Sequence, residues 1–250
     1  QPVAGGFDIL ADPGVPYIAT PSLCGAQTDF ETELPEVNSG DEAEGTIVIG
    51  NTHDVAVQHA RAISTATGIN ISSCTRSAFE NGDLKLEDYR LIDLAMGLQR
   101  ADGYSLTQTP VFTPALMKQL QACTTRGASL LLSGAYIGQG ESAASAKTSV
   151  TQATPAELFK FSHSGTIPHT SLMGVTGMNA SCTLYQFLDT QGTGVPSADV
   201  LFPTGGAFAC MLYTPTQQNA AVAYAGKDYK TMSFGFPLES ISDKTLRRQI

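Results

Sequence analysis

The sequence predicts an α/β fold with a doubly wound, mainly parallel sheet, and two features of the sequence support this prediction. First, short apolar runs alternate with segments of helical periodicity. The runs at 46–49, 91–97 and 129–134 are almost continuously hydrophobic, as strands buried on both faces are. Second, the last hundred residues hold mainly short strand-like runs, which predict an antiparallel extension on one edge of the sheet.

The first β-α-β unit is predicted to begin at Thr46, where a β-branched apolar run starts. Asp54 can cap a helix that continues to Thr67, and Gly68 is a natural C-terminal stop for it. The next strand is expected to begin at Ile69, which completes the unit in about 30 residues.

A second helix is predicted before the strand at 129–134. Thr113 and Pro114 are a cap and a first helical residue in sequence, and Gly127 ends the segment. Thr154 and Pro155 predict a further helix, which we expect to continue through Phe161. The later strands are expected at 171–175, 182–188, 207–213, 220–224 and 231–236.

Residues 1–45 are predicted to form an N-terminal arm that packs on an α/β domain at 46–250. The arm has closely spaced turn formers near Pro13 and an acidic segment at 31–44 without a clear period. Because the chain begins with Gln1 rather than Met, we expect a mature form or an excised piece of a longer protein.

Composition excludes some classes of partner. The net charge of −9 disfavours nucleic acids and anionic membranes, since both are bound through clusters of Lys and Arg. No apolar run approaches the roughly 20 residues that span a bilayer, so we expect no membrane insertion. Charged residues are only 15% of a chain rich in Ser, Thr, Asn, Gln and Gly, which favours a secreted or cell-envelope location.

The five cysteines form no CxxC pair, and their wide spacing does not suggest a disulfide framework. Cys123, Cys182 and Cys210 stand in apolar contexts, so we expect buried free thiols. No HxH or HxxxH spacing indicates a metal site, and no glycine pattern indicates a nucleotide cofactor. We therefore expect neither a metal nor a cofactor.

Ligands of open parallel sheets bind beyond the carboxyl ends of the strands. In this chain, three such ends are at 50–54, 97–100 and 133–138. Loop residues Asn51, Thr52, His53 and Asp54 are expected to line a crevice there, together with Ser133, Gly134 and Tyr136. His53 in particular can bind an anion or orient a substrate hydroxyl, although a plain loop histidine is the simpler interpretation.

The segment after Leu132 has the outline of a nucleophile elbow but lacks the Gly-x-Ser-x-Gly pattern. The tip is expected at Gly134 or Ala135, neither of which is a nucleophile, so Ser133 is only a weak catalytic candidate. A serine also needs a base within hydrogen-bond reach. His59 is predicted to be a surface or partly buried structural residue of the first helix, and His163 and His169 to lie in a polar loop.

Two stretches resemble class I glutamine-amidotransferase-like (flavodoxin-like) domains, which implies a three-layer fold. One runs from the strand around Ile92 through Met96-Gly97 to the turn at 130–138, and the other is the ending at 233–239. Active members carry His-Pro-Glu in that ending, whereas this chain has Phe236-Pro237-Leu238-Glu239. The elbow cysteine is also absent, so the resemblance implies a degenerate triad. Glu239 joins the expected ligand-binding residues on this basis.

Four motifs, in order, resemble secreted bacterial xanthan-lyase-like proteins. They are Asp12-Pro13-Gly14-Val15-Pro16-Tyr17-Ile18, Ile49-Gly50-Asn51-Thr52-His53-Asp54, Leu132-Ser133-Gly134-Ala135-Tyr136-Ile137-Gly138 and Gly235-Phe236-Pro237-Leu238-Glu239-Ser240-Ile241. The resemblance implies an exported module of a larger envelope protein concerned with polysaccharide.

Three hypotheses follow for the function. The first is a non-catalytic amidotransferase-like module that binds a glycan or neighbouring domains. The second is a carbohydrate-active enzyme, a polysaccharide lyase or hydrolase, that uses residues around Asn51, His53 and Tyr136. The third is a hydrolase that depends on Ser133. The missing triad favours the first.

Overall fold

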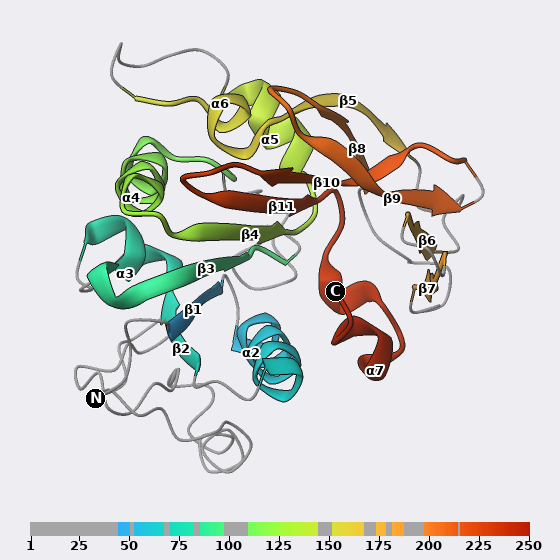
Figure 1. Ribbon diagram of the computed structural model, residues 1–250, viewed down its shortest axis with the longest axis horizontal. Helices are drawn as coiled ribbons and strands as arrows, with labels where there is room; N and C mark the ends of the chain where they lie inside the picture. Colours follow the sequence, from blue (N-terminus) through green and yellow to red (C-terminus); the bar gives the residue numbers. More distant parts are fainter. Residues whose placement is uncertain are drawn as a thin grey trace.

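The computed structural model describes residues 45–50, 53–67, 71–82, 86–97, 110–144, 152–167, 174–178, 182–187, 198–214 and 216–250. These residues form a mixed α/β fold around a nine-stranded sheet, with a two-stranded sheet beside it (Figure 1). The predicted arm at 1–45 lies outside the described residues, except for Gly45 at the start of the first strand.

In the first part of the described chain, strands alternate with helices. The α-helices are α2 (His53–Thr67), α3 (Arg76–Asn81), α4 (Pro114–Thr125), α5 (Ile137–Ala143), α6 (Pro155–Phe159) and α7 (Lys244–Arg247). Two 3₁₀ helices are η3 (Leu86–Asp88) and η5 (Leu238–Ser240). The first strands are β1 (Gly45–Gly50), β2 (Ile71–Thr75), β3 (Tyr89–Ala95), β4 (Ser129–Ser133), β5 (Phe161–Ile167) and β6 (Gly174–Gly177). The later strands are β7 (Leu184–Gln186), β8 (Ala198–Pro203), β9 (Phe208–Thr214), β10 (Asn219–Ala225) and β11 (Lys230–Phe234).

The large sheet has two halves that meet at β11. Its strand order is β2-β1-β3-β4-β11-β10-β9-β6-β7. Strands β2, β1, β3, β4 and β11 pair in parallel, whereas β10, β9, β6 and β7 continue the sheet by antiparallel pairing. The prediction of a mixed α/β chain with a largely parallel sheet and some antiparallel strands is confirmed.

Alternate side chains of the parallel strands point to opposite faces of the sheet and pack in different hydrophobic clusters. On one face, Val48 of β1 packs with Ala60 of α2. On the other face, Leu94 of β3 packs in a cluster with Phe79 of α3 and Leu116 of α4. Strands buried on both sides explain the continuous hydrophobic runs of the sequence.

The segment around α6 corrects one prediction. The expected cap at Thr154 is present, with a hydrogen bond from the Glu157 amide to the Thr154 hydroxyl. The helix ends at Phe159 rather than Phe161, because Lys160 adopts a left-handed conformation with φ 60° that ends the helix. Strand β5 then begins, and His163 lies in this strand and not in a polar loop.

The cysteines correct another prediction. Cys74 and Cys123 are buried free thiols, and Cys210 is partly buried, but Cys182 is exposed. Burial raises the pKa of Cys123 and that of Cys210 to about 11 each, so these thiols stay protonated at neutral pH. Cys182 lies two residues before β7, which is an edge strand of the large sheet.

Candidate functional site at the carboxyl ends of the strands

The carboxyl ends of the parallel strands bring four polar side chains together. Asp93 comes from β3 and Ser133 is the last residue of β4. Glu239 lies in η5, which follows β11, and His59 comes from the middle of α2. Because β3, β4 and β11 are parallel neighbours in the sheet, their carboxyl ends place these groups close together.

The imidazole of His59 is at the centre of this cluster. Its Nδ1 lies 2.7 Å from Asp93 Oδ2, and its Nε2 lies 3.4 Å from both Glu239 Oε2 and Ser133 Oγ. His59 is 4% exposed, and Asp93 and Ser133 are fully buried. His59 is therefore an interior residue, which corrects the expectation that it is a surface or partly buried one.

The two carboxylates hold the imidazole in its charged form. Burial by itself lowers the pKa of His59, because it removes water from the imidazolium. The charge and hydrogen bond of Asp93, with those of Glu239, outweigh burial and raise the pKa to about 10. At neutral pH, the cluster is an imidazolium between two carboxylates.

This charge state decides what the Ser133 hydroxyl can do. The order Asp93–His59–Ser133 resembles a catalytic triad in connectivity, but a general base must be able to accept a proton. A carboxylate lies beside each ring nitrogen of His59, and the ring is already protonated at neutral pH. It therefore cannot accept the serine proton. The Nε2–Oγ separation of 3.4 Å is also longer than a normal hydrogen bond, and the hydroxyl is buried.

The turn after β4 holds Tyr136 at its tip. Tyr136 has φ 62° and ψ 20°, a left-handed conformation, and directly precedes α5. This corrects the prediction that the tip is Gly134 or Ala135. Both flanking glycines fit the turn: Gly134 donates its N–H to the Phe236 carbonyl, and at Gly138 a side chain would collide with the His163 ring, 2.6 Å from the Cβ position.

The first turn of α5 is capped from within the protein. The buried Asp199 of β8 accepts hydrogen bonds from the backbone N–H of Gly138 at 2.8 Å and from that of Gln139 at 3.4 Å. The hydroxyl of Thr166 also donates to Asp199, at 3.1 Å. A carboxylate of the chain itself thus satisfies the amides of Gly138 and Gln139 in the first turn of α5.

The other predicted site residues have mixed outcomes. Asn51, Thr52 and His169 lie outside the described residues. His53 and Asp54 form the start of α2, but their side chains are not among those described. Ser133 and Glu239 meet at His59, as shown above, while Tyr136 stands at the elbow tip.

Two residues of the cluster, His59 and Asp93, were missed as site residues, although the sequence carried a signal for both. Asp93 interrupts the apolar run of β3, and a buried carboxylate needs a partner of opposite charge. His59 follows Val55 by four positions, so it lies on the apolar stripe of α2. A charged residue in a buried strand and a histidine on the buried face of a helix are therefore candidates for an ion pair with each other. The elbow tip had a signal too, because Gly134-Ala135-Tyr136-Ile137-Gly138 has the Gly-x-x-x-Gly frame of an elbow with Tyr136 at its centre.

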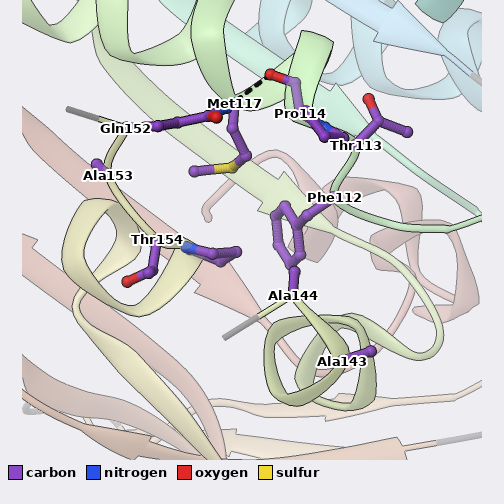
Figure 2. A pocket seen from close by; sticks show the side chains of 10 residues that line it. Phe112, Thr113, Pro114, Met117, Ala143, Ala144, Gln152, Ala153 and Thr154 are labelled. Carbon is purple, nitrogen blue, oxygen red and sulfur yellow. Dashed lines mark hydrogen bonds between the residues drawn. The ribbon is translucent and has the colours of Figure 1, made fainter. Parts of the chain in front are cut away.

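A pocket of about 210 Å³ lies apart from this cluster, between the start of α4, the end of α5 and the start of α6 (Figure 2). Its walls include Phe112, Met117, Ala144, Gln152 and Thr154. None of these residues belongs to the His59 cluster, so the pocket is a second and separate feature.

Among the described residues, no group of three or more His, Cys, Asp or Glu side chains is arranged to hold a metal ion. In the same part of the chain, no helix combines the length and the hydrophobicity needed to cross a bilayer.

No protein-family model matches the chain, and no curated protein matches it. Solved structures match in fold. A β-galactosidase from Bacillus circulans sp. alkalophilus has a TM-score of 0.51 at 7% identity, over 83% of this chain and 30% of that chain. The polyextremophilic β-galactosidase of the Antarctic haloarchaeon Halorubrum lacusprofundi has a TM-score of 0.50 at 13% identity, over 90% of this chain and 32% of that chain.

A glutamine amidotransferase from Thermotoga maritima is also similar, at 12% identity over 83% of this chain and 81% of that chain. Its TM-score is 0.44. The chain spans about a third of the length of either β-galactosidase. By fold alone, it therefore corresponds to one part of these larger carbohydrate-active enzymes.

Proposed function

We propose that the chain is a non-catalytic glycan-binding module of a larger exported protein concerned with polysaccharide. In this proposal the α/β unit is a flavodoxin-like, three-layer domain of the class I glutamine-amidotransferase-like kind with a degenerate triad, and residues 1–45 are an arm that packs on it. The larger protein is xanthan-lyase-like, is secreted or held in the cell envelope, and places neighbouring domains against this one.

The observation that carries the non-catalytic part is the state of His59. Its imidazolium is held by Asp93 and Glu239, and its pKa of about 10 removes the base that Ser133 would need. Tyr136 stands where an elbow enzyme has its nucleophile, and Asp199 occupies the adjacent backbone amides. The nucleophile and the base that acyl-transfer chemistry requires are thus replaced by groups that cannot perform these roles.

Two features support a glycan as the ligand. The two solved structures with TM-scores of 0.50 and 0.51 are both β-galactosidases, in which this fold is one part of a larger chain. In addition, the elbow tip holds a half-buried tyrosine that packs against the core cluster around Phe112, and the exposed part of its phenol can contact a sugar. The ligand then lies in the crevice between Tyr136 and the segment 51–54.

The test compares binding with turnover on the same glycans. Xanthan and a panel of acidic and neutral oligosaccharides are titrated calorimetrically, while ultraviolet absorbance follows unsaturated products and a reducing-end assay follows hydrolysis. We expect saturable binding without turnover. We also expect Tyr136→Ala to weaken binding at least fivefold, because it removes the ring from the elbow tip.

Tyr224→Ala is the matched control, since Tyr224 is also half-buried. It lies in β10 beside the amino end of β11, whereas Tyr136 lies at the carboxyl ends of the parallel strands. It should leave glycan binding unchanged. Turnover of any glycan would contradict the binding module and support the alternative function, a polysaccharide lyase or hydrolase. Failure to bind any member of the panel would overturn the glycan proposal.

A second candidate function is a hydrolase with Ser133 as the nucleophile, because the connectivity Asp93–His59–Ser133 is present. A fluorophosphonate probe, which labels activated serines, tests it directly. We expect no labelling at pH 7, since the hydroxyl is buried and its neighbour is protonated. Labelling that disappears in Ser133→Ala but persists in Ser129→Ala would establish the hydrolase instead.

A further inference from the structure

An irregularity in β5 brings two polar side chains to the same side of the small sheet. His163 and Thr166 are three positions apart, and in a regular strand such residues point to opposite faces. The register of β5 against β8 shifts between His163 and Gly165, so one extra residue turns His163 toward the side of Thr166. Thr166 stands opposite Asp199 of β8, and the three side chains therefore meet.

The first turn of α5 adds a fourth polar group. This helix lies beside β5 and β8 (Figure 1). Gln139 places its side-chain amide against both Thr166 and Asp199. The close approach depends on Gly138, because a Cβ there would lie 2.6 Å from the His163 ring and 3.0 Å from the Asp199 Cβ. An imidazole, a carboxylate, a hydroxyl and an amide thus converge from three elements.

The spacing of these four groups is too wide for a strong hydrogen-bond network. Only the Thr166 hydroxyl and Asp199 Oδ1 have an ordinary separation, 3.1 Å. His163 Nε2 lies 3.3 Å from Thr166 Oγ1 and 3.5 Å from Asp199 Oδ1. The amide nitrogen of Gln139 lies 3.4 Å from each of the same two oxygen atoms. These longer distances exceed the usual range of N–H···O hydrogen bonds, about 2.7–3.2 Å.

The same distances match the spacing between ligands of a tetrahedral metal ion. A regular tetrahedron with edges of about 3.4 Å has its centre about 2.1 Å from each corner, and Zn²⁺ binds nitrogen and oxygen ligands at about 2.0–2.2 Å. The amide of Gln139 offers its oxygen instead of its nitrogen after a half-turn of the terminal torsion. Only two of the four side chains are among His, Cys, Asp and Glu, so this cluster differs in kind from the groups that the described residues lack.

The donors and their surroundings restrict the ion further. An imidazole ligand favours Zn²⁺ and its first-row neighbours over Mg²⁺ and Ca²⁺. Ca²⁺ also needs longer bonds, about 2.3–2.6 Å, and more oxygen ligands. The carboxylate of Asp199 is oriented by the N–H groups of Gly138 and Gln139, which donate to Oδ2 and leave Oδ1 directed at the other three groups. Thr166 is exposed, so an ion can enter from solvent.

We propose that this cluster is a tetrahedral site for Zn²⁺ or a similar first-row divalent ion. Its ligand atoms are His163 Nε2, Asp199 Oδ1, Thr166 Oγ1 and the amide oxygen of Gln139. A bound ion joins α5 to β5 and β8 and so fixes the helix that directly follows Tyr136. Because the hydroxyl and the amide are neutral, weak donors, we expect micromolar affinity. The proposal does not depend on glycan binding in the crevice.

The experiment titrates the full chain, freed of metal with EDTA, with Co²⁺ at neutral pH. Tetrahedral Co²⁺ absorbs visible light strongly, whereas octahedral Co²⁺ absorbs weakly. We expect one Co²⁺ per chain with the strong absorption, displaced by Zn²⁺ but not by an equal concentration of Mg²⁺. His163→Gln should abolish this absorption and weaken Zn²⁺ binding at least tenfold, because it removes the nitrogen ligand.

Ser164→Ala is the matched control, because Ser164 is the exposed neighbour of His163 in the same strand and is not one of the ligands. It should leave the absorption and the affinity unchanged. If His163→Gln disturbs folding by circular dichroism, Gln139→Ala replaces it and should weaken Zn²⁺ binding at least threefold. Absence of Co²⁺ binding at millimolar concentration, an octahedral spectrum alone, or unchanged absorption and affinity in the folded ligand variant would each overturn the proposal.

Discussion

The imidazole Nδ1 of His59 and the carboxylate Oδ2 of Asp93 lie 2.7 Å apart, and both residues are buried at the carboxyl ends of the parallel strands. This pair joins α2 to β3, and Glu239 extends it to the segment after β11. Elements far apart in the sequence are thus held at one point by charge. In the proposed function, this pair positions the site and does no chemistry in it.

Removal of His59 should destabilise the protein strongly. His59→Ala leaves the buried carboxylate of Asp93 without its cation, and breaking a buried ion pair in this way costs about 3–5 kcal/mol. Chemical denaturation with urea measures the loss in the free energy of unfolding. Gln58→Ala is a suitable comparison on the same helix, because it removes only the hydrogen bond from Arg247 and should cost about 1 kcal/mol. A His59→Ala variant no less stable than Gln58→Ala would show that the pair contributes little.

The pair should also make stability depend on pH in the alkaline range. The folded protein holds the His59 proton up to a pKa of about 10, whereas the unfolded chain releases it near the ordinary value of 6.5. Between these values the folded state binds more protons, so the stabilisation is complete below pH 6.5 and is lost as pH rises toward 10. The expected slope is a loss of up to about 1.4 kcal/mol per pH unit.

Urea denaturation at several pH values from 6 to 10 measures this slope, and His59→Gln is the reference that cancels all other titrating groups. The free energy of unfolding of the natural chain should fall relative to that of the variant as pH rises. A difference between the two proteins that stays constant across this range would contradict the raised pKa.

The fold could be predicted from the sequence because local patterns decide it. The run at 129–134 and the Thr113-Pro114 start of α4 are signals that need no tertiary information, and β4 and α4 appear at those positions. Strand β8 and the C-terminal end of α6 were not predicted, since β8 follows a long polar stretch and Lys160 ends α6 by its backbone conformation.

The candidate site was less predictable, because it depends on which elements become neighbours. Ser133 was expected to lie at the crevice from its position at a strand end, and Glu239 from the resemblance of the segment 233–239 to the amidotransferase ending. No sequence pattern places His59 beside them, since 74 positions separate His59 from Ser133 and only the crossover of α2 along the sheet closes that distance. Sequence patterns of single elements do not report such approaches.

The conformation of Tyr136 predicts a difference between two substitutions. Tyr136→Ala and Tyr136→Gly both lose the ring, but only glycine adopts φ 62° without a steric cost. The glycine variant should therefore be more stable than the alanine variant by about 1 kcal/mol. Thermal and urea denaturation of the two variants side by side measure the difference, and a more stable alanine variant would contradict the left-handed tip.

Asp199 should be essential to the order of α5. Asp199→Ala leaves the Gly138 N–H and the Thr166 hydroxyl without their acceptor, and we expect a loss of about 2–4 kcal/mol in the free energy of unfolding. Thr166→Ala is the matched control, because it removes one exposed donor from the same carboxylate and should cost less than about 1 kcal/mol. Hydrogen exchange at α5 should rise in Asp199→Ala alone. Equal stability of the two variants would show that the cap is unimportant.

The protonation state of His59 in the folded protein tests the central claim most directly. Nitrogen-15 NMR of the histidine side chains distinguishes an imidazolium, in which both ring nitrogens carry protons, from either neutral tautomer. The ion pair of His59 with Asp93 predicts that His59 shows the imidazolium pattern at pH 7 and retains it to at least pH 9. A neutral His59 that titrates near pH 6.5, with Nε2 unprotonated toward Ser133, would contradict the account and restore a competent base to the site.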